Sequence, residues 1–139
     1  MKGNSVSICG NITRDAEIKE LASGSVALSF GVAWNSSRKV GDKWEDVPNF
    51  FDVKCYMTER QWVSVGNRCS FAKGNKVAII DGHLAYRTWE TDGQRRSKVE
   101  IVVDDPMNGL LTGERQPSQR EASAQRDAGV SIYDEDIPF

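Results

Sequence analysis

The stretch SVALSFGVAW, residues 25–34, alternates large apolar and small side chains without a break. The large side chains fall on one face of an extended chain: Val26, Leu28, Phe30, Val32 and Trp34. The other face carries only small residues: Ser25, Ala27, Ser29, Gly31 and Ala33. A period of two residues is typical of a β-strand with one buried face. We therefore predict a half-buried strand here.

A second strand with the same period is predicted over FFDVKCYM, residues 50–57. Four of its residues are expected to face the core: Phe51, Val53, Cys55 and Met57. The alternate positions are expected to face outward: Phe50, Asp52, Lys54 and Tyr56. Two aromatic rings and a lysine thus share the outward face. The segment between the two strands, NSSRKVGDKWEDVPN, residues 35–49, is predicted to be a loop. The segment SVSICGNI, residues 5–12, is predicted to open the sheet as a further strand.

The segment from Lys76 to Glu90 is long for one strand, and Gly82 in its middle indicates a bulge or sharp bend. TDGQ, residues 91–94, has the composition of a hairpin turn. The strand after the turn is predicted to point Val99, Ile101 and Val103 inward. Its outward positions are Arg96, Lys98 and Glu100.

One helix is predicted between the third and fourth strands, in residues 58–74. Thr58 and Gln61 have the spacing of a capping box, and Gly74 is the expected end. An apolar stripe runs along this segment: Trp62, Val65 and Cys69. The order β-β-β-α-β-β predicts an all-β fold, a five-stranded OB-fold Greek-key barrel with one helix closing its end.

The chain of 139 residues suits one domain with some length left over. We expect an OB-fold domain over residues 1–110, a flexible linker over 111–133 and an acidic tip over 134–139. Residues 1–110 carry 15 Lys and Arg against 14 Asp and Glu, whereas residues 111–139 carry 3 against 6. The overall net charge of −2 therefore reflects the C-terminal segment and gives no general attraction to nucleic acid.

The three cysteines form no CxxC pair, which argues against both a disulfide framework and a zinc site. We expect Cys9, Cys55 and Cys69 to be reduced and buried. The sequence shows no signal-peptide run and no apolar stretch of transmembrane length, which predicts a cytoplasmic protein without a membrane partner.

Aromatic and basic residues interleave on the predicted outward faces, as in grooves that stack bases and contact phosphates. The candidate DNA-binding residues are Trp34, Arg38, Trp44, Phe50, Lys54, Tyr56, Arg87, Trp89, Arg95, Arg96 and Lys98. Trp34 could equally pack in the core, and Phe50 and Tyr56 could be buried by a second subunit. Asp52 and Glu100 weaken the case, because they place negative charge on the same face.

Catalysis is not predicted, and neither is a cofactor or metal. The sequence has one histidine, His83, no nucleophile elbow, no Walker sequence and no carboxylate cluster with metal-ligand spacing.

Several segments together resemble the bacterial and phage single-stranded DNA-binding protein (SSB) family. The opening GNITRDAEIKEL, residues 10–21, is similar to a segment of that family, and KGNKVAIIDGHLAYRTWETDGQRR, residues 73–96, is similar to its fourth strand and hairpin. The last six residues, DEDIPF, resemble its acidic tip. With SVALSFGVAW, the matches span residues 4 to about 104 and the final six.

The resemblance implies a homo-oligomer, with a tetramer favoured, that coats single-stranded DNA in replication, recombination and repair. It implies that Phe50, Tyr56 and Trp89 stack on bases and that Trp44 lies in a hairpin loop that wraps DNA. It also implies that the tip binds DNA replication and repair proteins, through Asp134, Glu135, Asp136, Ile137, Pro138 and Phe139. Ala16 departs from the family pattern, as does the length of the segment 58–72, which leaves dimer and tetramer both open.

Two further functions fit the residues. An OB-fold adaptor with weak or no DNA binding would agree with the net acidity and with Asp52 and Glu100. An RNA-binding protein would differ only in its sugar preference, which nothing in the sequence indicates. The tip could also fold back and place Ile137 and Phe139 in a local groove.

Overall fold

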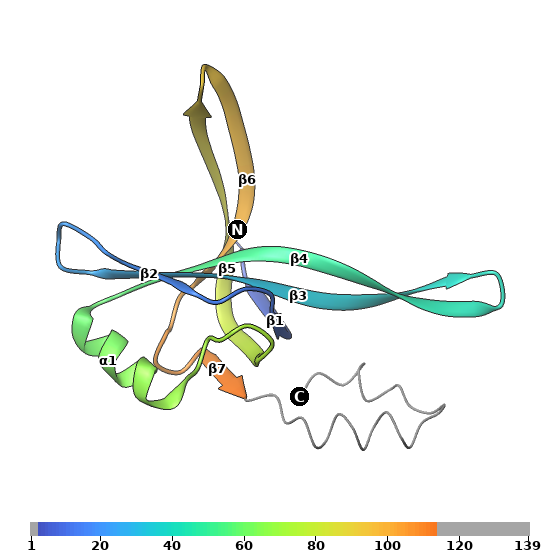
Figure 1. The fold of residues 1–139 in the computed structure, drawn as a ribbon, viewed down its shortest axis with the longest axis horizontal. Helices are drawn as coiled ribbons and strands as arrows, with labels where there is room; N and C mark the ends of the chain where they lie inside the picture. Colours follow the sequence, from blue (N-terminus) through green and yellow to red (C-terminus); the bar gives the residue numbers. More distant parts are fainter. Residues whose placement is uncertain (1–2, 114–139) are drawn as a thin grey trace.

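A computed structural model describes residues 3–113 of the chain. Seven strands and one helix follow one another along it (Figure 1). In chain order they are β1 (Val6–Ile12), β2 (Glu17–Glu20), β3 (Val26–Val40), β4 (Lys43–Met57), α1 (Glu59–Arg68), β5 (Lys76–Thr91), β6 (Gln94–Val103) and β7 (Leu110–Gly113).

Five of these strands close into a barrel. Neighbouring strands follow the order β1-β3-β4-β6-β5, and β5 pairs again with β1 to complete the ring. All these pairings are antiparallel except that of β4 with β6, which is parallel. The short strands β2 and β7 add to the edges of β3 and β5. The predicted five-stranded OB-fold barrel with one helix between its third and fourth strands is confirmed.

The barrel interior is built from the alternating residues that the sequence placed there. Four residues of β3 are at most 2% exposed: Val26, Leu28, Phe30 and Val32. The buried residues of β4 and β5 belong to the same core. Val65 of α1 is fully buried against this core, and Trp62 packs beside it. One helix therefore covers one end of the barrel, as Figure 1 shows.

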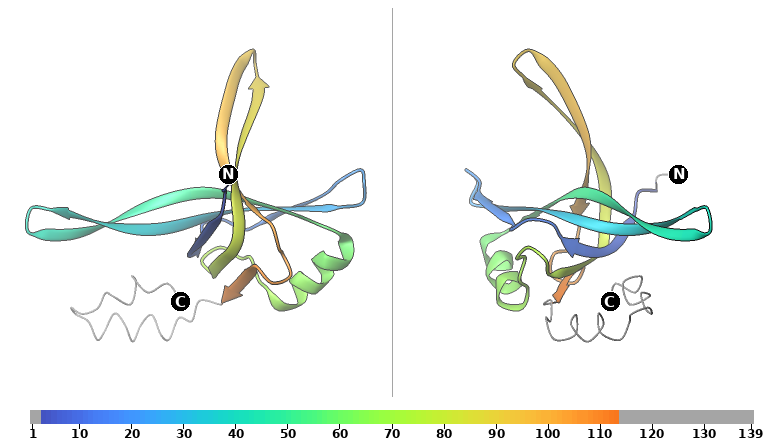
Figure 2. Two further views of the ribbon diagram at one scale, coloured as in Figure 1. Left: turned by 180° about the vertical axis from the view of Figure 1, so that it is seen from behind. Right: turned by 45° about the vertical axis from the view of Figure 1, so that its right-hand side comes forward.

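Two long hairpins project from the barrel in different directions (Figures 1 and 2). In the first, β3 and β4 stay paired from Val26 and Met57 out to Val40 and Lys43. The segment 35–49 was predicted as a loop, and this was wrong: most of it is strand. Most of its residues are polar and its few apolar residues do not alternate, so it lacks the pattern that marks a half-buried strand.

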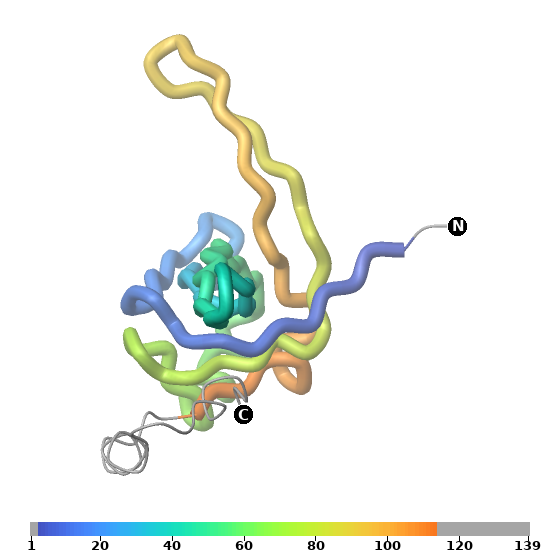
Figure 3. Tube along the Cα trace, turned by 90° about the vertical axis from the view of Figure 1, so that its right-hand side faces the viewer, coloured from blue at the N-terminus to red at the C-terminus, as the bar shows by residue number. Residues whose placement is uncertain are grey.

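The second hairpin is formed by β5 and β6 and stands away from the barrel (Figure 3). The register of β5 against β1 shifts between Ile79 and Gly82, which confirms the bulge. Gly82 is required there, because a Cβ would lie 2.9 Å from the carbonyl oxygen of Val102. The predicted turn is also confirmed, with Asp92 at φ 53° and Gly93 at φ 78°.

The helix is shorter than predicted. Its capping box is present, with Thr58 and Gln61 bonding to one another's backbone N–H, but it ends at Arg68 rather than near Gly74. The next residue, Cys69, is already extended, and Gly74 serves a turn before β5 at φ 93°. Neither β2 nor β7 was predicted, and β7 includes residues 111–113 of the segment expected to be a linker.

Val99 and Glu100 of β6 lie on the faces predicted for them, but their exposure to solvent is the reverse of what was expected. Val99 belongs to the core-facing row but is 55% exposed, because it lies on the hairpin beyond the barrel. Glu100 belongs to the outward row but is only 4% exposed. Within residues 3–113, no helix is long and apolar enough to cross a membrane.

Candidate nucleic-acid interface

Strand register places most of the candidate residues on one side of the sheet, the barrel exterior. On β4, alternate residues share this side, and the parallel pairing of Asp52 with Glu100 carries it onto β6. The pairing of Arg87 with Lys98 and of Trp89 with Arg96 carries it onto β5. We call this side the outer face. Its candidate residues are Trp44, Phe50, Lys54, Tyr56, Arg87, Trp89, Arg96 and Lys98.

The aromatic rings of β4 on the outer face are open to solvent. Phe50 and Trp44 are each 69% exposed and Tyr56 is 52% exposed. Large apolar side chains exposed in a row along one strand are unusual, since burying each would stabilise the fold by about 1.5–3 kcal/mol. They are therefore available to a ligand or to a second chain.

Trp89 on β5 is half-buried because two cations lie against its ring. The guanidinium carbon of Arg87 is 5.0 Å from the ring centroid, and Nζ of Lys98 is 5.9 Å from it. Such cation–π contacts contribute about 0.5–1 kcal/mol each at exposed sites. They hold the indole in place on the outer face.

Three predicted residues lie on the opposite side of the hairpins. Trp34 and Arg38 occupy the row of β3 that leads out of the core, and Arg95 pairs with Glu90 on the far side of the β5–β6 hairpin. Trp34 is 42% exposed, so core packing does not account for it. Nη2 of Arg38 lies 3.9 Å from Oε2 of Glu45. The structure does not bring these residues together with Phe50 and Tyr56.

Four charged residues form a network in the middle of the outer face. Nζ of Lys98 lies 3.0 Å from Oδ2 of Asp52 and 3.4 Å from Oε2 of Glu100. Nη2 of Arg14 donates to the other carboxylate oxygen of Asp52 at 3.4 Å. We call these residues, Arg14, Asp52, Lys98 and Glu100, the charge network. It contains two positive and two negative groups, so it is neutral as a whole.

The path of the β1–β2 connection explains how Arg14 reaches β4. The backbone N–H of Thr13 donates to the carbonyl of Gly31 at 2.9 Å, where the connection crosses β3. Gly31 is paired with Asp52, and a Cβ on it would collide with Oγ1 of Thr13. Glycine at position 31 therefore lets Arg14 approach the neighbouring strand closely.

The charge network is tightly constrained because Glu100 is buried. Its side chain is 5% exposed, and Oε2 lacks a hydrogen-bond partner among the described residues, so the ammonium of Lys98 is its main compensation. Nη1 of Arg14 is also buried without a partner within residues 3–113. Removing one partner of a buried ion pair typically costs about 3–5 kcal/mol, and it costs less here because Lys98 is 33% exposed. Lys98 is thus held more firmly than an ordinary surface lysine.

Sequence reasoning missed Arg14 and Tyr86. Arg14 is 38 positions from Asp52, and no local pattern connects them. Tyr86, 70% exposed, lies opposite Val99 on the side of the β5–β6 hairpin that faces away from the outer face, near Leu84. The bulge at Gly82 shifts the alternation of β5, so that Leu84 and Tyr86 continue the core-facing row of Val77 and Ile79, and allowing for that shift would have identified them as one apolar row.

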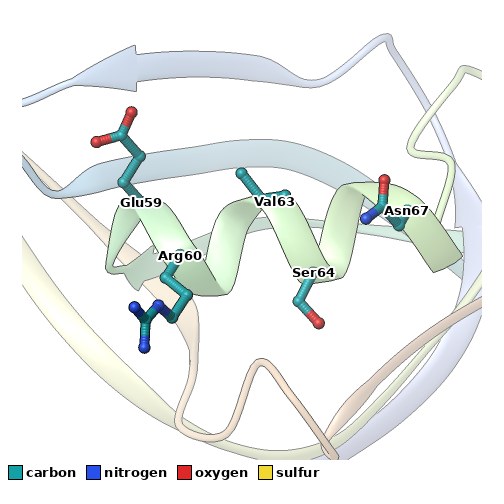
Figure 4. Close-up of a pocket in the computed structure, with 5 residues that line it drawn as sticks. All are labelled: Glu59, Arg60, Val63, Ser64 and Asn67. Carbon is teal, nitrogen blue, oxygen red and sulfur yellow. The ribbon is translucent and has the colours of Figure 1, made fainter.

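Other features of residues 3–113 are a surface depression on α1 and three cysteines. The exposed side of α1 has only a shallow depression, lined by Glu59, Arg60, Val63, Ser64 and Asn67 (Figure 4). In the described part of the chain, no three His, Cys, Asp or Glu side chains come together as a metal site. All three cysteines are free thiols, and burial raises the pKa of Cys55 to about 12. The rest of the predicted linker, residues 114–133, and the predicted tip, residues 134–139, lie outside the described residues.

The topology and the exposed rings define a class: an OB-fold protein whose barrel exterior presents aromatic and basic side chains. The model of the single-strand binding protein family matches residues 3–108. This chain belongs to the single-strand binding protein family.

Two curated relatives are similar over most of their length. The chain is 36% identical over 130 residues to the single-stranded DNA-binding protein of Treponema pallidum, covering 92% of this chain and 71% of that protein. It is 31% identical over 150 residues to that of Borreliella burgdorferi, covering 98% and 97%.

Two solved structures have the same fold. One is a Plasmodium falciparum SSB in complex with single-stranded DNA, with a TM-score of 0.66, 20% identity, and 84% of this chain and 97% of that chain covered. The other is a deletion mutant of the Thermus aquaticus single-stranded DNA-binding protein, with a TM-score of 0.60, 22% identity, and 82% and 51% covered. At these identities the likeness shows the fold alone.

Proposed function

We propose that this chain is a sequence-tolerant single-stranded DNA-binding protein that coats and protects the strand. The observation that supports this most directly is the outer face, where exposed Phe50 and Tyr56 and cation-flanked Trp89 share one side of the barrel. Aromatic faces stack on any base, and such stacking contributes about 1–3 kcal/mol per base. The names of the bacterial relatives agree with this proposal.

The basic side chains of the outer face complete the proposed site. Lys54 and Arg96 lie on it, and no ion pair to either is found within residues 3–113, so they are available for phosphates. Because each phosphate contact releases counterions, binding should weaken steeply as salt rises. The two hairpins would extend the contact beyond the barrel, with Trp44 towards the end of one.

The test is a titration of the intact protein with oligo-dT at two salt concentrations, following tryptophan fluorescence. We expect quenching that saturates, with a lower affinity at the higher salt. Fluorescence and electrophoretic mobility that stay unchanged at low salt would contradict the proposal. The same titration with oligo-rU distinguishes DNA from RNA as the preferred strand.

The adaptor alternative loses one of its supports. Asp52 and Glu100 were its main evidence on this face, and both are neutralised by Arg14 and Lys98. We therefore retain DNA binding as the conclusion and place the chain in DNA replication, recombination and repair. Within that proposal, the acidic tip recruits replication and repair proteins.

The proposed protein is a homo-oligomer, with a tetramer favoured. Leu84, Tyr86 and Val99 are 46%, 70% and 55% exposed and leave an apolar surface on the side of the β5–β6 hairpin opposite the outer face. A second copy of the chain could cover this surface without blocking Phe50 and Tyr56. Light scattering of the free protein measures the number of subunits, and a monomeric mass would contradict this part of the proposal.

A further inference from the structure

The charge network occupies the centre of the face that would bind DNA, which poses a problem for Lys98 as a phosphate ligand. Lys98 was predicted to contact DNA, yet its ammonium already lies 3.0 Å from Asp52 and 3.4 Å from Glu100. Its side chain is 33% exposed, so part of it can be reached from solvent. Whether it contacts a phosphate depends on whether it can leave its partners.

The burial of Glu100 determines whether Lys98 can leave the carboxylates for a phosphate. If Lys98 turned to a phosphate, it would leave the carboxylate of Glu100, which is 5% exposed and has no other compensating cation within 4.0 Å among the described residues. An uncompensated buried charge costs far more than a contact between exposed ions gains. Lys98 also lies against the Trp89 ring, and moving it would remove that contact.

Arg14 is restrained by Asp52. Its Nη2 contacts Oδ1 of Asp52 while Lys98 contacts Oδ2, so one carboxylate holds both cations. Asp52 is 40% exposed and lies on β4 between Phe50 and Lys54. A phosphate near Asp52 would meet a carboxylate. It would find no net positive charge there, because the charge network as a whole is neutral.

We propose that Asp52 is a positioning residue that holds Arg14 in the charge network, and that Asp52 and Glu100 together hold Lys98, so that neither cation contacts the DNA phosphates. The bound strand is then held at the centre by stacking on Phe50, Tyr56 and Trp89, and its phosphates are contacted by unpaired cations around the network, such as Lys54 and Arg96. This inference rests on the proposed function, because it concerns how the outer face binds a single strand.

The salt dependence of binding tests this directly. For single strands, log Kobs falls with log salt with a slope of about −0.7 for each phosphate neutralised. One contact therefore changes the loss of affinity between 50 and 200 mM salt by about 3-fold. We would measure this slope for oligo-dT with the full chain and its variants, after checking by thermal unfolding that each variant is folded.

The matched pair of variants is Lys98→Gln and Lys54→Gln, because both remove one lysine from the outer face. Lys54→Gln should reduce the magnitude of the slope by about 0.7, whereas Lys98→Gln should leave the slope unchanged. Lys98→Gln leaves Glu100 without its cation and could therefore unfold the protein. The double variant Lys98→Gln with Glu100→Gln keeps the charge network neutral, and it replaces the single variant in that case. A slope reduced by about 0.7 in the double variant would overturn the inference.

Asp52→Asn is the complementary test. It releases Arg14, while Lys98 still has Glu100 as a partner. The slope should become steeper by about 0.7, and binding at 50 mM salt should become about 3-fold or more tighter. Unchanged slope and affinity in Asp52→Asn would overturn the inference while the proposed function stands. A wild-type chain with no affinity for oligo-dT would instead overturn the proposed function and this inference together.

Discussion

At the scale of single residues, the side of the strand on which an aromatic ring lies should determine its role. Trp89 lies on the outer face between Arg87 and Lys98, whereas Trp34 lies on the other side of the β3–β4 hairpin. Trp89→Ala should weaken oligo-dT binding by about 1–3 kcal/mol, or roughly 5- to 150-fold, because one stacked base is lost. Trp89→Phe should retain most of the affinity.

The control for that substitution is Trp34→Ala, which removes an equally large ring from the opposite side. Its affinity for oligo-dT, measured by anisotropy of a labelled strand, should stay within about 2-fold of wild type. A loss in Trp34→Ala as large as that in Trp89→Ala would show that the strand contacts both sides of the hairpin.

Cys55 gives a prediction about reactivity. It is fully buried, and burial raises the pKa of its thiol from 9.0 to about 12. At pH 8 only on the order of one molecule in 10,000 carries the reactive thiolate. Ellman's reagent should therefore modify Cys9 and Cys69, which are half-buried, well before Cys55. Rapid modification of all three thiols in the folded protein would contradict this.

The same pKa shift has a consequence for stability. The folded-state pKa of Cys55 lies above its pKa in the unfolded chain, so the contribution of the protonated thiol is fully present below pH 9. That contribution is lost as the pH rises from 9 towards about 12, at up to about 1.4 kcal/mol per pH unit. Replacing Cys55 with Ala should remove this part of the alkaline dependence in urea titrations.

At the scale of elements, Arg68 connects the end of α1 to the segment between β6 and β7. Its guanidinium donates to the carbonyls of Pro106 and Met107 at 2.7 Å and of Leu110 at 3.0 Å. Arg68→Gln should lower the free energy of unfolding by about 1–2 kcal/mol, less than three full charge-assisted bonds because the residue is partly exposed. Urea unfolding measures the difference.

Arg60→Gln is the matched control, because Arg60 lies on the exposed side of the same helix. It should change the free energy of unfolding by no more than about 0.5 kcal/mol. Equal losses in the two variants would mean that helix charge, rather than the three carbonyl contacts, accounts for the effect of Arg68.

The strands also show which parts of the fold the sequence could predict. Residues 26–32 and 53–57 alternate because one face is buried in the barrel, and the sequence predicted those strands and their faces. Residues 35–49 are held as a hairpin by main-chain pairing and a few polar side-chain contacts rather than by burial in the core, so their side chains carry no apolar period. The contact between Arg14 and Asp52 depends on how the barrel closes, which no local pattern encodes.

At the scale of the whole molecule, the proposed DNA-binding domain and the proposed acidic tip should act separately. Deleting residues 134–139 should abolish recruitment of replication and repair proteins, because it removes the proposed peptide ligand. Affinity for oligo-dT should stay equal or rise slightly, because an acidic segment competes with phosphates for the same cations. A clear loss of DNA affinity on deletion would contradict this separation.

The central claim is that the outer face binds single-stranded DNA through Phe50, Tyr56 and Trp89. Photo-crosslinking of the intact protein to oligo-dT containing 5-iododeoxyuridine, followed by peptide mass spectrometry, tests it most directly. The predicted result is crosslinks at these three residues, suppressed by excess unlabelled oligo-dT. Crosslinks confined to Trp34, Tyr86 or other residues away from the outer face, or no specific crosslink at all, would contradict the claim.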